Sequence, residues 1–148
     1  EGQIINWALQ TATNVKQWRF SVRYDNQQTW SKNSTGKLAS QIFSNMITCQ
    51  ATSDLIFPTG IKLPLIGVVP LRNRLIFDSS VFYNTRGSAV NVEADNFQNF
   101  GFKLSADYEI SKNFRFTLGS NFSRYLFTFV PEENYTLIEF LSKLTIQF

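Results

Sequence analysis

Two carboxylates, Asp107 and Glu109, are the residues of this 148-residue sequence whose types and spacing come nearest to a catalytic pair. They stand two positions apart, so on a β-strand they would project from the same face, about 6.6–6.8 Å apart along the strand. That separation suits a general acid and a general base. The sequence offers no nucleophile motif beside them, and it has no histidine, the commonest general base. We therefore expect no enzymatic activity.

The sequence also gives no indication of a metal site, a redox site or a nucleic-acid-binding surface. Cys49 is the only cysteine, which leaves no internal disulfide and no thiolate set for a metal ion. The net charge is only +3 and no basic cluster stands out, so no nucleic-acid partner is expected. We expect no cofactor and no metal.

The segment that carries the two carboxylates has a strong pattern of its own. From residue 100 to 110, apolar side chains such as Phe100, Phe102 and Leu104 alternate with polar or small ones such as Lys103 and Ser105. Period-two alternation predicts a β-strand with one apolar and one polar face. The same kind of pattern predicts seven strands, at about residues 3–13, 17–30, 37–57, 74–84, 100–110, 114–123 and 138–148.

No convincing helix interrupts these strands. The segment from Pro58 to Pro70 contains three prolines and two glycines, so it is expected to be a connection and not a central strand. The remaining links are expected at residues 14–16, 31–36, 86–96, 111–113 and 131–136. No apolar run approaches the roughly 18–20 residues that a membrane helix needs.

Strand length and composition favour a membrane setting. The sequence is 43% hydrophobic and 16% aromatic, and several predicted strands are about ten residues or longer. Strands of that length, with one face for lipid and one for water, are typical of transmembrane barrels. The predicted fold class is all-β, an antiparallel transmembrane β-barrel in which residues 1–148 form a single segment. A soluble ligand-binding barrel such as a lipocalin also alternates, but soluble strands are usually shorter, about 5–6 residues.

The last eleven residues read I-E-F-L-S-K-L-T-I-Q-F and end on an aromatic ring. Apolar residues recur there on one parity, with Ser142 as the interruption. This ending resembles the signal that the barrel-assembly machinery reads in bacterial outer-membrane barrels. The resemblance implies an outer-membrane location, contact with outer-membrane lipid, and an assembly signal made of Phe140, Leu144, Ile146 and Phe148.

Charged residues concentrate on the other parity, and both signs are interspersed. We expect this face to line a hydrated lumen in which the charges neutralise one another. A selectivity cluster or a catalytic cluster is the sharper alternative. The predicted lumen-facing charges are Arg19, Arg23, Arg74, Asp78, Lys103, Asp107, Glu109, Arg115, Glu139 and Lys143.

The predicted number of strands is odd, and this bears on whether the sheet can close into a barrel. In such barrels the last strand runs inward from the cell surface, so residues 111–113 would be periplasmic and residues 131–136 extracellular. Seven strands leave the first and the last running in the same direction, whereas bacterial single-chain barrels have an even number. Because the sequence begins abruptly at Glu1, we favour a piece of a larger barrel, joined by other strands or subunits. The alternative is a small self-contained eight-stranded barrel with a structural or adhesive role.

Four segments resemble the C-terminal strands of SprA-type barrels, the large outer-membrane translocons of the type 9 secretion system. They read DLIFPTGIKLPLIG from residue 54, NRLIF from residue 73, SADYEISKNFRFTLG from residue 105 and SKLTIQF from residue 142. The resemblance covers residues 37 to 148. It implies a non-catalytic role in protein export, as part of the wall of a wide pore.

Overall fold

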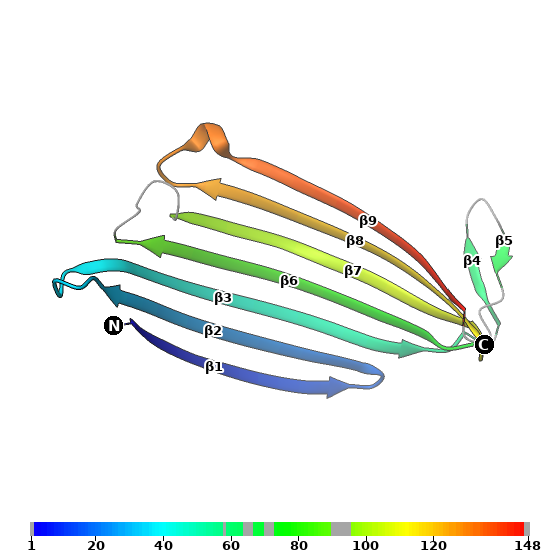
Figure 1. Ribbon diagram of the computed structural model, residues 1–148. Coiled ribbons are helices and arrows are strands. Elements are labelled where there is room, and N and C mark those ends of the chain that lie inside the picture. Colours follow the sequence, from blue (N-terminus) through cyan, green and yellow to red (C-terminus); the bar gives the residue numbers. More distant parts are fainter. Residues whose placement is uncertain (1, 58, 64–66, 70–72, 90–95, 147–148) are drawn as a thin grey trace.

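The computed structural model describes residues 2–57, 59–63, 67–69, 73–89 and 96–146, and nearly all of them lie in β-strands (Figure 1). Seven long strands form one sheet, and two short strands form a separate hairpin. The strands are β1 (Gly2–Val15), β2 (Trp18–Lys32), β3 (Leu38–Leu55), β4 (Ile61–Leu63), β5 (Gly67–Val69), β6 (Leu75–Ser88), β7 (Phe97–Ser111), β8 (Phe114–Phe127) and β9 (Tyr135–Ile146).

The main sheet is an antiparallel meander in the order β1-β2-β3-β6-β7-β8-β9. The prediction of an all-β antiparallel fold with seven long strands is therefore confirmed. Within the described residues the sheet is open and does not close into a barrel, with β1 and β9 at its two edges (Figure 1). Because every neighbouring pair is antiparallel, β1 and β9 run in the same direction.

The register of the sheet tests the predicted faces, because residues directly opposite one another on neighbouring strands project from the same side. A shift of one residue in any strand would move its apolar residues to the other side. No such shift occurs between the central residues of the seven strands. One cross-strand row contains Thr11, Val22, Cys49, Val81, Phe102, Phe122 and Ile138.

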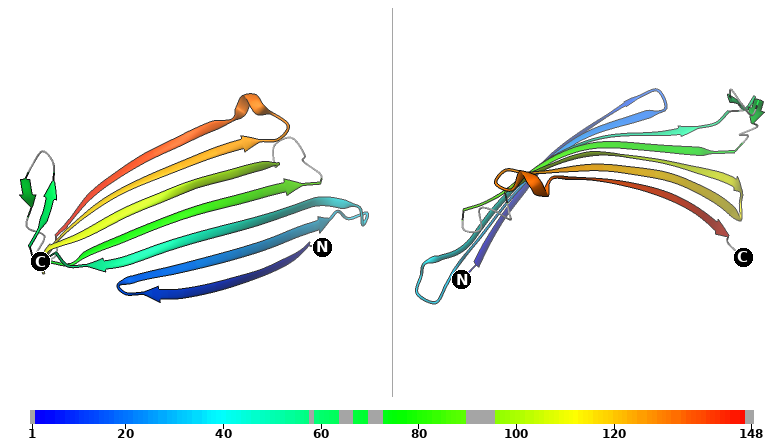
Figure 2. Two further views of the ribbon diagram at one scale, coloured as in Figure 1. Left: turned by 180° about the vertical axis from the view of Figure 1, so that it is seen from behind. Right: turned by 90° about the horizontal axis from the view of Figure 1, so that it is seen from above.

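The sheet is a single twisted layer, and the two further views show no element packed on either of its faces (Figure 2). Among the side chains that the structure describes, no hydrophobic one is buried. Soluble domains bury the apolar face of a sheet against a second layer. Here long strands hold their shape through backbone pairing while their apolar side chains remain exposed.

The turn between β2 and β3 is fixed by one side chain. The Asn33 Oδ1 accepts hydrogen bonds from the backbone N–H of Thr35 (3.1 Å), the Thr35 hydroxyl (2.7 Å) and the backbone N–H of Lys37 (2.9 Å). Gly36 supplies the positive φ of 78° that the turn requires. An asparagine that replaces missing backbone partners in this way is a common turn device.

Several strands extend past the end of their alternating pattern. β1 continues to Val15, β2 to Lys32, β6 to Ser88, and β9 begins already at Tyr135. The links predicted at residues 14–16, 31–36, 86–96 and 131–136 were therefore too wide. Backbone pairing with a neighbouring strand extends these elements, and that pairing leaves no mark in the periodicity of one strand.

The proline-rich connection is not part of the main sheet, as predicted, but it contains the β4–β5 hairpin. This hairpin lies beyond the end of the sheet (Figure 1). Between β8 and β9 the chain makes one turn of 3₁₀ helix, η1 (Pro131–Glu133). No helix in the described part of the chain is long and apolar enough to cross a membrane.

Candidate functional surfaces

The first candidate surface is the apolar face, which we define as the side of the main sheet that carries Phe102 and Leu104. Its exposed members include Phe140, 83% exposed, and Val81, 61% exposed. Every strand of the main sheet contributes to it. The apolar face includes Ile5, Leu9, Phe20, Val22, Ile47, Val81, Phe100, Phe102, Leu104, Phe114, Leu118, Ile138, Phe140, Leu144 and Ile146.

Polar residues enter the apolar face near the β2–β3 turn. Asn26 and Asn45 lie opposite one another there. The Asn45 Oδ1 accepts hydrogen bonds from the Tyr24 hydroxyl (2.8 Å) and from the Asn26 Nδ2 (2.6 Å). Gln28 and Gln41 are the next polar residues toward the turn on this face. The apolar face of β2 and β3 therefore includes polar residues over the part of the strands nearest the turn.

The second candidate surface is the opposite side of the sheet, which we call the polar face. The cross-strand register places all the predicted charged residues that lie inside strands on this one face. Arg74, which directly precedes β6, donates from its guanidinium to Asp54 of β3. That the polar face lines a water-filled lumen stays a prediction. The charged residues placed on it are Arg19, Arg23, Asp78, Lys103, Asp107, Glu109, Arg115, Glu139 and Lys143.

Charges on the polar face find partners within the sheet. Arg23 and Asp25 form an ion pair at 2.6 Å, as do Arg74 and Asp54. Asp78 accepts hydrogen bonds from the Gln50 amide (2.7 Å) and the Thr52 hydroxyl (2.8 Å) of β3. These charges of the polar face are therefore paired with opposite charges or with hydrogen-bond donors of the sheet.

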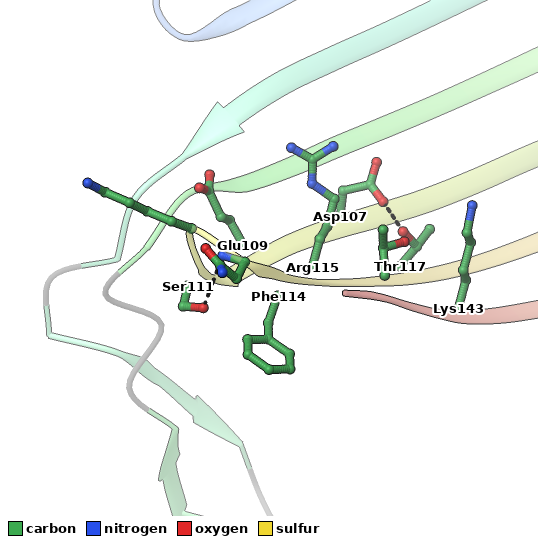
Figure 3. A pocket seen from close by; sticks show the side chains of 10 residues that line it. Asp107, Glu109, Ser111, Phe114, Arg115, Thr117 and Lys143 are labelled. Atoms are coloured by element: carbon green, nitrogen blue, oxygen red, sulfur yellow. Dashed lines mark hydrogen bonds between the residues drawn. The ribbon is translucent and has the colours of Figure 1, made fainter. Parts of the chain in front are cut away.

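Asp107 and Glu109 border a shallow open depression of about 280 Å³ beside the β7–β8 turn (Figure 3). The Thr117 hydroxyl donates a hydrogen bond to Asp107, and Arg115 lies directly opposite Glu109. Lys143 of β9 lines the same depression. The structure thus surrounds the two carboxylates with cationic and hydroxyl groups. In the described residues, no three Cys, Asp or Glu side chains gather closely enough to hold a metal ion.

The predicted assembly signal is only partly visible. Phe140, Leu144 and Ile146 all lie on the apolar face of β9, the edge strand of the sheet. Phe148 lies outside the described residues. The role of these residues in assembly stays a prediction.

Sequence reasoning missed an aromatic cluster on the polar face, near the β8–β9 loop. Its members are Phe97, Tyr125, Phe127 and Tyr135, and we call it the aromatic patch. The Tyr125 and Tyr135 rings stack with their centroids 4.6 Å apart, and the ring centroids of Phe97 and Phe127 are 5.7 Å apart. The signal was present in the sequence as aromatic residues on the polar parity, but they lie where the predicted strands had already ended.

No protein-family model, curated protein or solved structure matches the chain. The resemblance to SprA-type barrels therefore rests on the four sequence segments alone.

Proposed function

We propose that this chain is part of the wall of a non-catalytic β-barrel in the bacterial outer membrane, with its apolar face in lipid and its polar face toward water. The carrying observation is the apolar face itself: it continues in register across seven strands, and no described element covers it. Soluble monomers rarely expose a contiguous apolar patch larger than about a few hundred Å², whereas this face extends across all seven strands. Lipid would cover the apolar face without a second layer of protein.

The outline of the sheet supports this proposal. The β1–β2 pairing ends at Val15 and Trp18, and the same cross-strand row reaches Leu118 on β8. The β7–β8 pairing continues four residues further, to Phe114. We assume that the β1–β2 and β7–β8 turns lie at one level of the membrane. An offset of four residues across four strand spacings then corresponds to a strand tilt of about 35°. Strands in membrane barrels tilt by about 35–45°.

The opposite end of the sheet shifts in the same sense and further. The β8–β9 pairing ends at Tyr125 and Tyr135, whose row reaches Asp25 on β2. From Asp25 the β2–β3 pairing continues another seven residues, to Lys32. The larger offset and the polar residues near this turn indicate that the β2–β3 hairpin extends beyond the lipid.

We place this wall in a pore for protein export, as the resemblance to SprA-type barrels implies. The open edges favour a barrel larger than these seven strands. Because β1 and β9 run in the same direction, an antiparallel closure requires further strands between them. Unpaired edges do not persist in lipid, where each backbone group needs a partner. The partners of the wall are therefore outer-membrane lipid, the barrel-assembly machinery, and other strands or subunits.

Cys49 permits a direct test, since it is the only cysteine and lies exposed on the apolar face. Its neighbour Gln50 lies on the polar face. In outer membranes, a charged, membrane-impermeant maleimide should leave Cys49 unmodified. The matched variant, with Cys49→Ser and Gln50→Cys, should be labelled because its thiol faces water. Rapid labelling of Cys49 together with protection of the variant would overturn the proposed orientation of the sheet.

A further inference from the structure

The aromatic patch departs from the rest of the polar face. Elsewhere that face is mostly charged or hydrogen-bonding, but here four rings lie in mutual contact within two cross-strand pairs. Phe97 pairs with Phe127, and Tyr125 pairs with Tyr135. Tyr135 is 50% exposed, and Leu137, the next residue of β9 on this face, is 40% exposed. The proposed lipid does not reach this side of the sheet, so lipid contact does not account for the patch.

An acidic turn forms the rim of the aromatic patch. The loop from Phe127 to Tyr135 joins two members of the patch (Figure 1). Its turn η1 contains the exposed residues Glu132 and Glu133. The loop is held in place, because the Asn134 Oδ1 accepts a hydrogen bond from the backbone N–H of Phe127 at 2.6 Å. The two glutamates therefore stand on the short loop that links Phe127 to Tyr135.

Among the described residues, no ion pair joins a basic group to this rim. Arg124, adjacent to Tyr125 in sequence, projects from the apolar face. Arg86 lies opposite Phe97, on the far side of the patch from η1, and is already engaged by other groups of the protein. Neither of the ion pairs identified in the described residues involves Glu132 or Glu133.

A buried polar side chain also borders the aromatic patch. Asn99 lies directly opposite Tyr125 at the foot of the patch and is only 7% exposed. Its Oδ1 is buried and has no hydrogen-bond partner. Buried acceptors are normally hydrogen-bonded, so Asn99 is an exception in the sheet, and it borders the aromatic patch.

We propose that the aromatic patch and its acidic rim form a docking surface for a cationic segment of polypeptide, one that carries lysine or arginine side chains. Ammonium and guanidinium groups bind the faces of Tyr and Phe rings, and they are attracted by carboxylates at the edge. An acidic segment would be repelled by Glu132 and Glu133, and a neutral sugar would make no use of their charge. The inference rests on the proposed function in one respect: with lipid on the apolar face, the aromatic patch faces water.

The test uses the full chain in a non-ionic detergent and a fluorescent ten-residue peptide of alternating Lys and Ser. A peptide of alternating Glu and Ser and a neutral maltohexaose serve as competing probes. The Lys peptide should bind, and its binding should weaken strongly in 1 M salt because charges are then screened. Equal binding of the Glu peptide, or displacement of the Lys peptide by maltohexaose, would overturn the proposal.

Variants locate the surface. The double variant Glu132→Gln and Glu133→Gln, in an exposed turn, should weaken binding about five- to tenfold. Loss of one cation–π contact in Tyr135→Leu should weaken it about two- to fivefold. The matched controls are Glu109→Gln, at the other end of the polar face, and Tyr108→Leu, on the apolar face. Binding that is unchanged in the patch variants, or equally reduced in the controls, would contradict the assignment.

Discussion

Leu104 and Lys103 are neighbours on β7 whose side chains project from opposite faces of the sheet. Leu104→Arg would place a charge in lipid, which costs about 2–4 kcal/mol near the bilayer midplane. Lys103→Ala should cost little, since Lys103 makes one long contact with the Phe82 ring, 5.9 Å from its centroid, worth about 0.5–1 kcal/mol. Urea titration of both variants folded in lipid vesicles measures the difference. If Lys103→Ala were the more damaging change, the two faces would be assigned the wrong way round.

Gly101 shows how close packing acts at a single residue. A Cβ at this position would lie 2.1 Å from the Phe122 carbonyl oxygen and 2.8 Å from the Phe82 ring. The oxygen belongs to the backbone of the neighbouring strand and cannot move without disturbing the β7–β8 pairing. Gly101→Ala should therefore destabilise the sheet by about 1–3 kcal/mol.

Gly119 on β8 is the matched control for Gly101. A Cβ there would meet its nearest atom, the Leu104 carbonyl oxygen, at an ordinary 3.5 Å. Gly119→Ala should change the free energy of unfolding by no more than about 0.5 kcal/mol. Equal destabilisation by the two alanine variants, measured by denaturant titration, would mean that neither glycine is required for close approach.

At the scale of elements, the β2–β3 hairpin is the part of the sheet that projects furthest. Trp18 and Trp30 lie at opposite ends of β2 and on the same face, with polar Asn26 and Gln28 between Trp30 and the apolar stretch. If the hairpin leaves the lipid, Trp30 should be quenched by aqueous iodide and Trp18 by brominated lipid. Single-tryptophan variants, with the other two tryptophans changed to Phe, separate the signals. Quenching of both residues by brominated lipid would place the whole of β2 in the bilayer.

The strands show how far the sequence could predict the fold. Alternation in β7 and β8 was strong enough to predict both the elements and their faces, because the period of two reports directly which side each residue takes. The ends of β2 and β6 were not predictable in this way, since their last residues are held by pairing with another strand. The aromatic patch was missed for the same reason: Tyr125 and Phe127 of β8 lie beyond the region where the pattern holds.

At the scale of the whole molecule, closure could not be predicted from periodicity. Alternation in a strand reports two faces but not which strand borders each edge. The seven strands pair in chain order, and the described edges are β1 and β9. The periodicity of these seven strands carries no information on further strands, and our proposal of a larger barrel rests on the common direction of β1 and β9.

The same arrangement predicts how the isolated chain behaves. The sheet has two unpaired edges and an uncovered apolar face, and none of its described hydrophobic side chains is buried. Without an apolar solvent, edge pairing and apolar contact between copies should drive aggregation. In detergent micelles the apolar face is covered, so the chain should keep a β-sheet circular dichroism spectrum. Sedimentation velocity with and without detergent measures both states. A monodisperse, folded monomer in detergent-free buffer would show that the apolar face is stable in water, and the membrane proposal would then fail.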